Sequence, residues 1–340
     1  MRHPAKNVVL SRRRLMAAFV GAACLASAGV HAQAPAYPTK PVRFVVPFAP
    51  GGPTDALARN LAAKMGELLG KPVIVDNRPG ASGTIGVAAV AHAPADGYTL
   101  LFHEVAATFA IQPVITKALT YDVRKDFTPI SLAASGPIFL VVNSTVPVRN
   151  VKELIELAKK KPGDVSFASS GGVGQLPTHI GPELLKMKHG LDLNHIPYKG
   201  AGPAMVDIAA GRVSMIMTTG LGSVQQFIDS GKVKALAITG DKRADALPNV
   251  PTFAEEGVPL PELSGGTMWG LLGPAGLPRD IVVKLNQAVV KAMASPEVRE
   301  KLTALNIEPR TSSPEAFSEL IKKETETWGG VLKRMNIQVD

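Results

Sequence analysis

The chain has 340 residues, of which 46% are hydrophobic and 5% aromatic, and it carries 37 Lys and Arg against 28 Asp and Glu, a formal charge of +9. This length suggests two domains with full-sized cores, and so much apolar content excludes a disordered chain. The single cysteine excludes a disulfide framework and any cysteine-rich zinc or iron–sulfur site.

Residues 1–32 have the features of a secretory signal peptide. Five basic residues and no acid lie in positions 1–14, a short apolar run follows from Leu15 to Ala28, and Val30-His31-Ala32 offers a cleavage site. The run is shorter than the ~20 residues of a membrane span, and an uncleaved anchor is the alternative. We predict export with cleavage near Ala32; the arginine run 12–14 leaves open whether the general or the twin-arginine route is used.

Cleavage there changes the meaning of the charge. It leaves 308 residues with 32 basic and 28 acidic side chains, a net +4, and it removes Cys24, which we expect to be discarded rather than lipidated. The basic runs Lys159-Lys160-Lys161 and Lys322-Lys323 are short and lack interleaved aromatic residues. We therefore expect no nucleic-acid partner.

Predicted strands and helices alternate along the rest of the chain. Leu57, Leu61, Met65 and Leu68 recur at helical spacing after the β-branched run 42–46, and later segments repeat the scheme. Strands are predicted at 42–46, 73–75, 98–102, 138–143, 165–168, 193–198, 213–217, 233–238 and 268–272. Helices are predicted at 54–68, 85–92, 151–158, 178–188, 203–210, 281–293, 297–305 and 314–332. The alternation is typical of parallel α/β architecture.

Two glycine-rich turns join a predicted strand to a predicted helix, one in each half of the chain. They are Pro50-Gly51-Gly52-Pro53-Thr54-Asp55 and the segment from Ser169 to Gly174. Glycine allows close backbone approach, and helix N-termini present N–H groups to anions. Each turn is either an anion-binding turn or an ordinary strand-to-helix connection.

The sequence completes no catalytic, metal-binding or nucleotide-binding motif. The sequence has no G-x-S-x-G motif, and His103-Glu104 begins an HExxH-like string in which Ala107 replaces the second histidine. Gly80–Gly86 fits neither nucleotide-binding glycine pattern. We expect no catalytic residue, metal or cofactor. His179 is the histidine that we place near a ligand, and Trp269 could lie in a core or line a cleft.

Several further motifs are similar to those of one family. They are Tyr37-Pro38-Thr39-Lys40-Pro41-Val42-Arg43, Val46-Pro47-Phe48-Ala49-Pro50-Gly51-Gly52 with Asp55 and Arg59, Asn77-Arg78-Pro79-Gly80, Asp96-Gly97-Tyr98-Thr99-Leu100-Leu101, Lys125–Ile130, Pro197-Tyr198-Lys199-Gly200, Leu247-Pro248 with Val250-Pro251-Thr252, and Trp269-Gly270-Leu271-Leu272 with Pro274-Ala275-Gly276. In this order the chain resembles the Bug family, the extracytoplasmic solute receptors of tripartite tricarboxylate transporters, over essentially its whole mature length.

The resemblance implies a type II periplasmic-binding-protein fold. It predicts two α/β lobes, each with a mostly parallel central sheet flanked by helices, and a ligand cleft between them. Two crossing strands are expected near 137–143 and 265–272. Lobe 1 would comprise residues 33–137 and 268–340, and lobe 2 residues 138–267.

The resemblance also implies a binding site made of two jaws. One jaw is expected to hold Phe48, Gly51, Gly52, Thr54 and Asp55, and the other Ser169, Ser170, Gly171, Gly174, Thr178 and His179, with Tyr198, Thr218 and Thr219 as wall residues. His103 and Glu104 depart from the family's usual run of small polar residues. They would either select a ligand with a donor or cation distal to its carboxylate, or belong to a surface turn.

The function implied is that of a periplasmic, monomeric receptor. It would capture a small organic carboxylate and deliver it to the integral-membrane subunits of the transporter. The alternative is a periplasmic sensor that passes its ligand-bound state to a kinase. A third possibility, a periplasmic hydrolase, lacks a recognisable nucleophile–base set.

Overall fold

Two mixed β-sheets organise the described part of the chain. The structure is a computed structural model that describes residues 37–116, 119–170, 174–222 and 224–335. The predicted signal peptide and Gly171 lie outside these residues. From Lys40 onward the chain forms one compact unit, which contains both sheets.

The first sheet has six strands in the order β11-β4-β10-β3-β1-β2. β1 is parallel to both of its neighbours, whereas β10 is antiparallel to β3 and β4, and β11 is antiparallel to β4. The strands are β1 Val42–Val46, β2 Val73–Asn77, β3 Thr99–Glu104, β4 Phe127–Gly136, β10 Thr267–Pro274 and β11 Glu308–Pro309.

The second sheet has five strands in the order β7-β6-β8-β5-β9. β6 is parallel to β7 and β8, and β5 is antiparallel to β8 and β9. The strands are β5 Ile138–Asn143, β6 Ser166–Ser170, β7 Asn194–Tyr198, β8 Met215–Thr219 and β9 Val233–Ile238.

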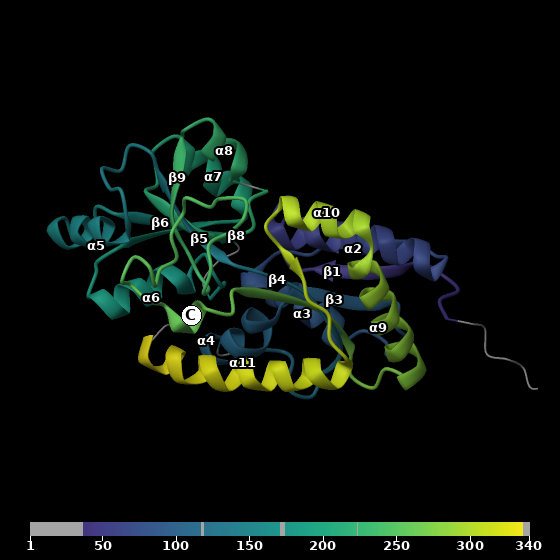
Figure 1. Ribbon diagram of the computed structural model, residues 1–340. Helices are drawn as coiled ribbons and strands as arrows, with labels where there is room; N and C mark the ends of the chain where they lie inside the picture. The colour runs from purple at the N-terminus through teal and green to yellow at the C-terminus, as the bar shows by residue number, and fades with distance from the viewer. Residues whose placement is uncertain (1–36, 117–118, 171–173, 223, 336–340) are drawn as a thin grey trace, which may run out of the picture. The chain divides into compact units, whose positions relative to one another are not determined.

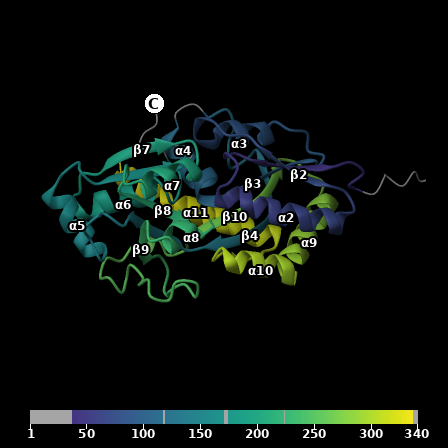
Figure 2. The same ribbon diagram turned by 90° about the horizontal axis from the view of Figure 1, so that it is seen from above.

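Helices accompany each sheet (Figure 1). Those that follow strands of the first sheet are η1 Ala81–Gly83, α2 Pro53–Leu69, α3 Thr84–Ala91, the π-helical turn η2 Ala107–Ile111, α4 Gln112–Ile115, α9 Arg279–Ala294, α10 Pro296–Ala304 and α11 Pro314–Met335. Those that follow strands of the second sheet along the chain are α5 Val151–Lys160, α6 Ile180–His189, α7 Ala201–Ala209, α8 Gln225–Asp229 and η3 Pro261–Leu263. In Figure 2, α5, α6, α7 and α8 group around the second sheet, whereas α2, α9 and α10 lie together beside the first.

The helix α5 shows how the sequence produces these elements. Asn150 caps it, because its side chain accepts a hydrogen bond of 2.8 Å from the Glu153 amide. Val151, Leu154, Ile155 and Ala158 then form one buried stripe against the second sheet. The cap and the stripe are both visible in the sequence, which is why this helix is predicted well.

Gly86 has a packing role in the glycine-rich segment Gly80–Gly86. A Cβ atom on Gly86 would lie 2.8 Å from the Arg78 carbonyl oxygen and 2.8 Å from the Pro47 Cβ. The glycine therefore allows α3 to pack directly on the end of β1, a structural use of the residue that needs no phosphate.

The two-lobed α/β architecture agrees with the sequence prediction, but the sheets are mixed rather than mostly parallel. The chain crosses between the sheets twice, from β4 through Pro137 to β5 and again into β10. A strand that enters from the other lobe runs against its new neighbours, so β10 and β5 are antiparallel to the strands beside them. The residue boundaries of the lobes stay a prediction, although the strands on either side of 137 belong to different sheets.

The helix α11 contributes to both lobes. Near its start Phe317 packs in a cluster with first-sheet residues such as Leu101 and Leu272. Near its end Trp328, Val331 and Leu332 pack in the cluster that contains Ile138 and Leu140 of β5. Figure 1 shows the helix running beneath both sheets. No helix in the described ranges combines the length and apolar character needed to cross a membrane.

Candidate functional site

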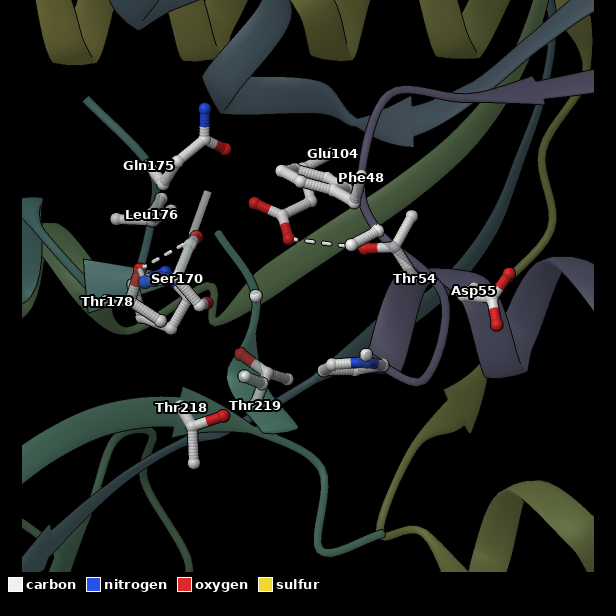
Figure 3. A pocket seen from close by; sticks show the side chains of 16 residues that line it. Phe48, Thr54, Asp55, Glu104, Ser170, Gln175, Leu176, Thr178, Thr218 and Thr219 are labelled. Carbon is white, nitrogen blue, oxygen red and sulfur yellow. Dashed lines mark hydrogen bonds between the residues drawn. The ribbon is translucent and has the colours of Figure 1, made fainter. Parts of the chain in front are cut away.

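A pocket lies between loops of the two lobes (Figure 3). The first lobe contributes the loop after β1, the start of α2 and the end of β3. The second contributes the segment after β6, the start of α7 and the end of β8. The lining residues are Phe48, Ala49, Gly52, Pro53, Thr54, Asp55, Glu104, Ser170, Gln175, Leu176, Pro177, Thr178, Gly200, Ala201, Thr218 and Thr219.

Asp55 shapes the loop after β1. Its carboxylate accepts hydrogen bonds from the Gly51 amide at 3.0 Å, from Arg59 Nε at 3.0 Å and from Asn77 Nδ2 at 2.9 Å. Burial alone would raise the pKa of Asp55, but these hydrogen bonds and the Arg59 charge outweigh it, so the pKa lies below its ordinary value. The carboxylate is therefore ionised, paired and already engaged, which makes Asp55 an anchor of the loop. Gly51 adopts a φ of +92°, a conformation suited to glycine.

The N-terminus of α2 reaches the pocket without a side-chain cap. Gly52 is the N-cap residue, and Pro53 in the first helical position has no N–H. The backbone amides of the first turn therefore lack the side-chain acceptor that usually satisfies them. With the partial positive charge of the helix end, they form a place where an anion is stabilised.

The N-terminus of α7 faces the same pocket from the second lobe. Its N-cap residue, Gly200, also provides no side-chain cap, and both Gly200 and Ala201 line the pocket. A Cβ atom on Gly200 would lie 3.5 Å from the Cβ of Ala49, so the two lobes are in van der Waals range here. Two uncapped helix ends from opposite lobes thus converge on one pocket.

The segment after β6 supplies polar groups to the same wall. The Ser170 amide donates to Thr178 Oγ1 at 3.1 Å, and the threonine hydroxyl in turn donates to the Ser170 carbonyl oxygen at 3.5 Å. Gln175 crosses to the first lobe, because its Nε2 donates to the Ser82 carbonyl at 2.7 Å. Gln175 is 2% exposed, and its Oε1 has no hydrogen-bond partner.

Glu104, at the end of β3, lies between the two walls (Figure 3). Trp269 Nε1 donates to Thr54 Oγ1 at 2.9 Å, and Thr54 Oγ1 in turn contacts Glu104 Oε1 at the long distance of 3.4 Å. Glu104 Oε2 has no partner, although the residue is only 8% exposed. Burial raises the pKa of Glu104 to about 8.

Eight of the residues predicted for the two jaws and the wall line this pocket: Phe48, Gly52, Thr54, Asp55, Ser170, Thr178, Thr218 and Thr219. Gly51 lies on the neighbouring side of the same loop. Tyr198 lines an adjoining groove with Phe48 and Ala49, and its hydroxyl donates to Asp207 at 2.6 Å.

Ser169, Gly174 and His179, which were also predicted for the site, lie behind the lining. Gly174 donates from its amide to His179 Nδ1 at 3.2 Å, and Ser169 Oγ lies 2.7 Å from His195 Nε2. The rings of His179 and His195 are 4.6 Å apart, and both pack on Phe167. The sequence predicted a helix over 178–188, which would include His179. In the structure His179 is the N-cap residue of α6, just before the helix.

The surface-turn alternative for His103 and Glu104 is wrong. His103 is 2% exposed, its Nδ1 lies 2.9 Å from the Glu104 carbonyl oxygen, and its ring packs on Phe48 with centroids 5.0 Å apart. Burial lowers the pKa of His103 to about 4. His103 therefore supports Phe48 from behind, and Glu104 is the one of the two that reaches the pocket. Trp269, fully buried, supports Thr54 in the same way.

Sequence reasoning did not assign Gln175, Gly200 and Ala201 to the site. A signal for Gly200 was present, because Tyr198-Lys199-Gly200 repeats the strand–glycine–helix pattern of the first loop. Gln175 has no such signal, since its position depends on the contact with Ser82 in the other lobe.

The charge of the lining is unusual for an anion site. None of its described residues is Lys, Arg or His, and the only charged types are Asp55 and Glu104. Over the described residues, no cluster of three or more His, Cys, Asp and Glu side chains could hold a metal ion. The groups able to attract an anion here are backbone amides and hydroxyls.

Comparison with known proteins places this geometry in a family. The Tripartite tricarboxylate transporter family receptor profile matches residues 57–337. The chain is 37% identical to protein BugT of Bordetella pertussis over 311 residues, which cover 91% of this chain and 94% of BugT.

Two solved structures from Rhodopseudomonas palustris are also similar to this chain. One, described with adipate, is 34% identical with a TM-score of 0.82 and covers 89% of this chain and 99% of its own. The other, MatC with bound malate, is 32% identical with a TM-score of 0.81, and the match covers 87% of this chain and 100% of MatC. The chain therefore belongs to the Bug family, the extracytoplasmic receptors of tripartite tricarboxylate transporters.

Proposed function

We propose that the protein captures a small organic carboxylate in the pocket between its lobes, in the periplasm, and delivers it to the membrane subunits of a tripartite tricarboxylate transporter. The observation that carries the proposal is the convergence of two uncapped helix N-termini, those of α2 and α7, on one interlobe pocket. Related structures that hold adipate and malate support the class of ligand.

The ligand carboxylate would be held without a side-chain cation. Backbone amides at the start of α2 and α7 carry partial positive charge, and the hydroxyls of Ser170, Thr178 and Thr218 stand beside them. Such hydrogen bonds are strengthened by the charge of the acceptor and by removal of water. A dissociation constant near micromolar, about −8 kcal/mol, fits a receptor that must also release its ligand.

The chemistry of the pocket fits binding and release. The described lining places no histidine or lysine beside Thr54, Ser170, Thr178 or Thr218 that could activate them as nucleophiles. We expect the ligand to be recovered unchanged after long incubation. Delivery would be tested by co-purification with transporter membrane subunits; recovery of a sensor kinase in their place would favour a sensing role.

Substituting Gly52 tests the site. A Cβ built on Gly52 meets nothing within 4 Å, and its φ of −86° suits any residue, so the fold should tolerate Gly52→Val. The branched side chain would nevertheless stand between the first amides of α2 and a ligand. We expect at least a tenfold loss of carboxylate affinity by calorimetry with a nearly unchanged unfolding temperature.

Gly329→Val on α11 adds the same side chain where a Cβ also meets nothing within 4 Å, and it serves as the matched control. If Gly52→Val unfolded the protein as strongly as it weakened binding, the loop would be a plain structural turn. A panel of organic acids that never stabilises the wild-type protein would contradict the proposed function.

A further inference from the structure

Two buried oxygen atoms of residues that line the pocket have no hydrogen-bond partner. They are Oε2 of Glu104 and Oε1 of Gln175, in residues that are 8% and 2% exposed. Buried polar atoms in folded proteins are nearly always paired, and an unpaired one is costly. Both residues line the pocket, which points to a group on the ligand as the missing partner.

The orientation of Gln175 follows from its contact with the first lobe. The Ser82 carbonyl is only an acceptor and lies 2.7 Å from the amide nitrogen of Gln175, so the nitrogen must face Ser82. The amide oxygen then faces away from Ser82. In Figure 3 this oxygen lies on the side of Gln175 that is turned toward Glu104.

The hydrogen bonds around Glu104 leave one carboxyl oxygen for the ligand. Thr54 Oγ1 accepts from Trp269 at 2.9 Å, so its own proton is available to Glu104 Oε1. Oε2 is not reached by this chain of donors. Figure 3 shows the carboxyl group between Phe48 and Thr54 on one side and the Ser170–Thr178 segment on the other.

The charges around the pocket select the kind of donor. Asp55, from α2, is neutralised by Arg59 at 3.0 Å, and His103, on the same strand as Glu104, packs behind Phe48. Neither β10 nor the second lobe contributes a charged residue to the described lining. A second ligand carboxylate would therefore meet no side-chain cation and would face the acceptor oxygen of Gln175, with only the neutral carboxyl group of Glu104 able to donate to it. An ammonium group instead has three donors for the two oxygens and the charge complementary to an ionised Glu104.

We propose that the ligand is an amino-carboxylate, whose carboxylate lies at the helix N-termini and whose ammonium lies between Glu104 and Gln175. Glu104 is then the residue that determines specificity for an amino group over a second carboxylate. The inference rests on the proposed function, because it assumes that the same pocket binds a carboxylate.

Ligand binding would move one proton. In the empty pocket burial raises the pKa of Glu104 to about 8, so the carboxyl group is mostly protonated at pH 7. Binding of an ammonium favours the carboxylate, and the proton of Glu104 passes to solvent while the ammonium keeps its three. Calorimetry in buffers of different ionisation enthalpy measures this release directly.

Two matched ligand pairs test the inference on the wild-type protein. Aspartate and malate differ in an ammonium against a hydroxyl, and 4-aminobutyrate and succinate differ in an ammonium against a carboxylate. We expect the amino member of at least one pair to bind at least tenfold tighter than its partner, with release of close to one proton at pH 7.

The variant Glu104→Gln keeps the shape and removes the charge. We expect it to lose at least tenfold in affinity for the amino ligand and to abolish proton release, whereas Glu156→Gln on the surface of α5 changes neither. Should Glu104→Gln fail to fold, proton release by the wild-type protein still decides.

The outcomes separate the inference from the function on which it rests. Tight binding of malate or succinate without proton release, and weak binding of both amino ligands, would overturn the inference and leave a carboxylate receptor. Failure of all four ligands and of a wider organic-acid panel would instead remove the proposed function.

Discussion

At the scale of a single residue, Glu104 is proposed to favour ligand binding while it lowers the stability of the empty protein at neutral pH. Its pKa of about 8 in the folded protein lies above the ordinary value of 4.5. The folded state therefore holds a proton that the unfolded chain gives up, and stability is lost as pH rises from 4.5 toward 8. At one pKa unit per 1.36 kcal/mol, the loss at pH 7 is about 3 kcal/mol.

Replacing this carboxyl should therefore stabilise the empty protein. We expect Glu104→Gln to raise the free energy of unfolding at pH 7 by about 3 kcal/mol and to have little effect at pH 4.5, because the amide does not titrate. Urea unfolding between pH 4.5 and 8 measures both. A variant less stable than wild type at every pH would show that Glu104 is a structural residue.

Residues of the site differ in how visible they are in the sequence. Gly52 is predictable, because a strand followed by paired glycines and a helix start implies a turn at a helix N-terminus. Asp55 was expected in the same jaw, but its role as the anchor of the loop depends on Gly51, Arg59 and Asn77 and is seen only in the structure. The partnerless oxygens of Glu104 and Gln175 are not predictable, since they arise only where β3, the segment after β6 and Ser82 meet.

At the scale of elements, the start of α6 and the strand β7 bring two histidines into contact. His179 precedes α6 and His195 lies in β7; the His195 ring stacks on Phe167 and the His179 ring packs against it at a tilt. Burial, together with the nearby charges of His195 and Lys186, lowers the pKa of His179 to about 3. Below pH 6.5, His179 binds a proton in the unfolded chain but not in the folded protein, so the free energy of unfolding falls as pH falls.

This pair should make the second lobe sensitive to acid. From pH 7 to pH 5 we expect a loss of about 2 kcal/mol from His179 alone. In His179→Asn the amide oxygen could accept the Gly174 N–H in place of Nδ1, so the pH dependence should flatten. Unfolding curves at both pH values test this, with exposed His92→Asn as the control. An unchanged slope in His179→Asn would rule out the pair as its source.

Elements were predictable where the chain carries a local period. The stripe of α5 and the β-branched run of β5 give their positions almost to the residue. β4 contains Pro129 and a run of small residues, so it lacks a strand-like alternation, and its strand conformation comes from pairing with β10. The buried turn η2 is likewise held by α11 and not by its own sequence.

For the whole molecule, the discontinuous first lobe depends on contacts between distant segments. β10 pairs with β3 and β4 across more than a hundred residues, and residues 106–115 join the cluster that contains β5 and the end of α11. Composition and periodicity do not encode such pairings, and only resemblance to a known family indicated them. This cluster joins the lobes through buried apolar packing, whereas Ala49 and Gly200 meet only at the pocket, so we expect the lobes to open at the contact between these two residues.

Locking that contact tests whether the lobes must separate for ligand exchange. The 3.5 Å between the Ala49 Cβ and a Cβ on Gly200 lies within the range of a disulfide, and the extended φ of −173° at Gly200 accepts any residue. The only native cysteine, Cys24, lies in the predicted signal peptide, so the double variant Ala49→Cys, Gly200→Cys would carry one isolated pair. We expect its oxidised form to release bound ligand at least tenfold more slowly than its reduced form, measured by displacement of a radiolabelled ligand. Each single cysteine variant controls for the substitution itself. Equal release rates in both redox states would mean that ligand reaches the pocket without separation of the lobes.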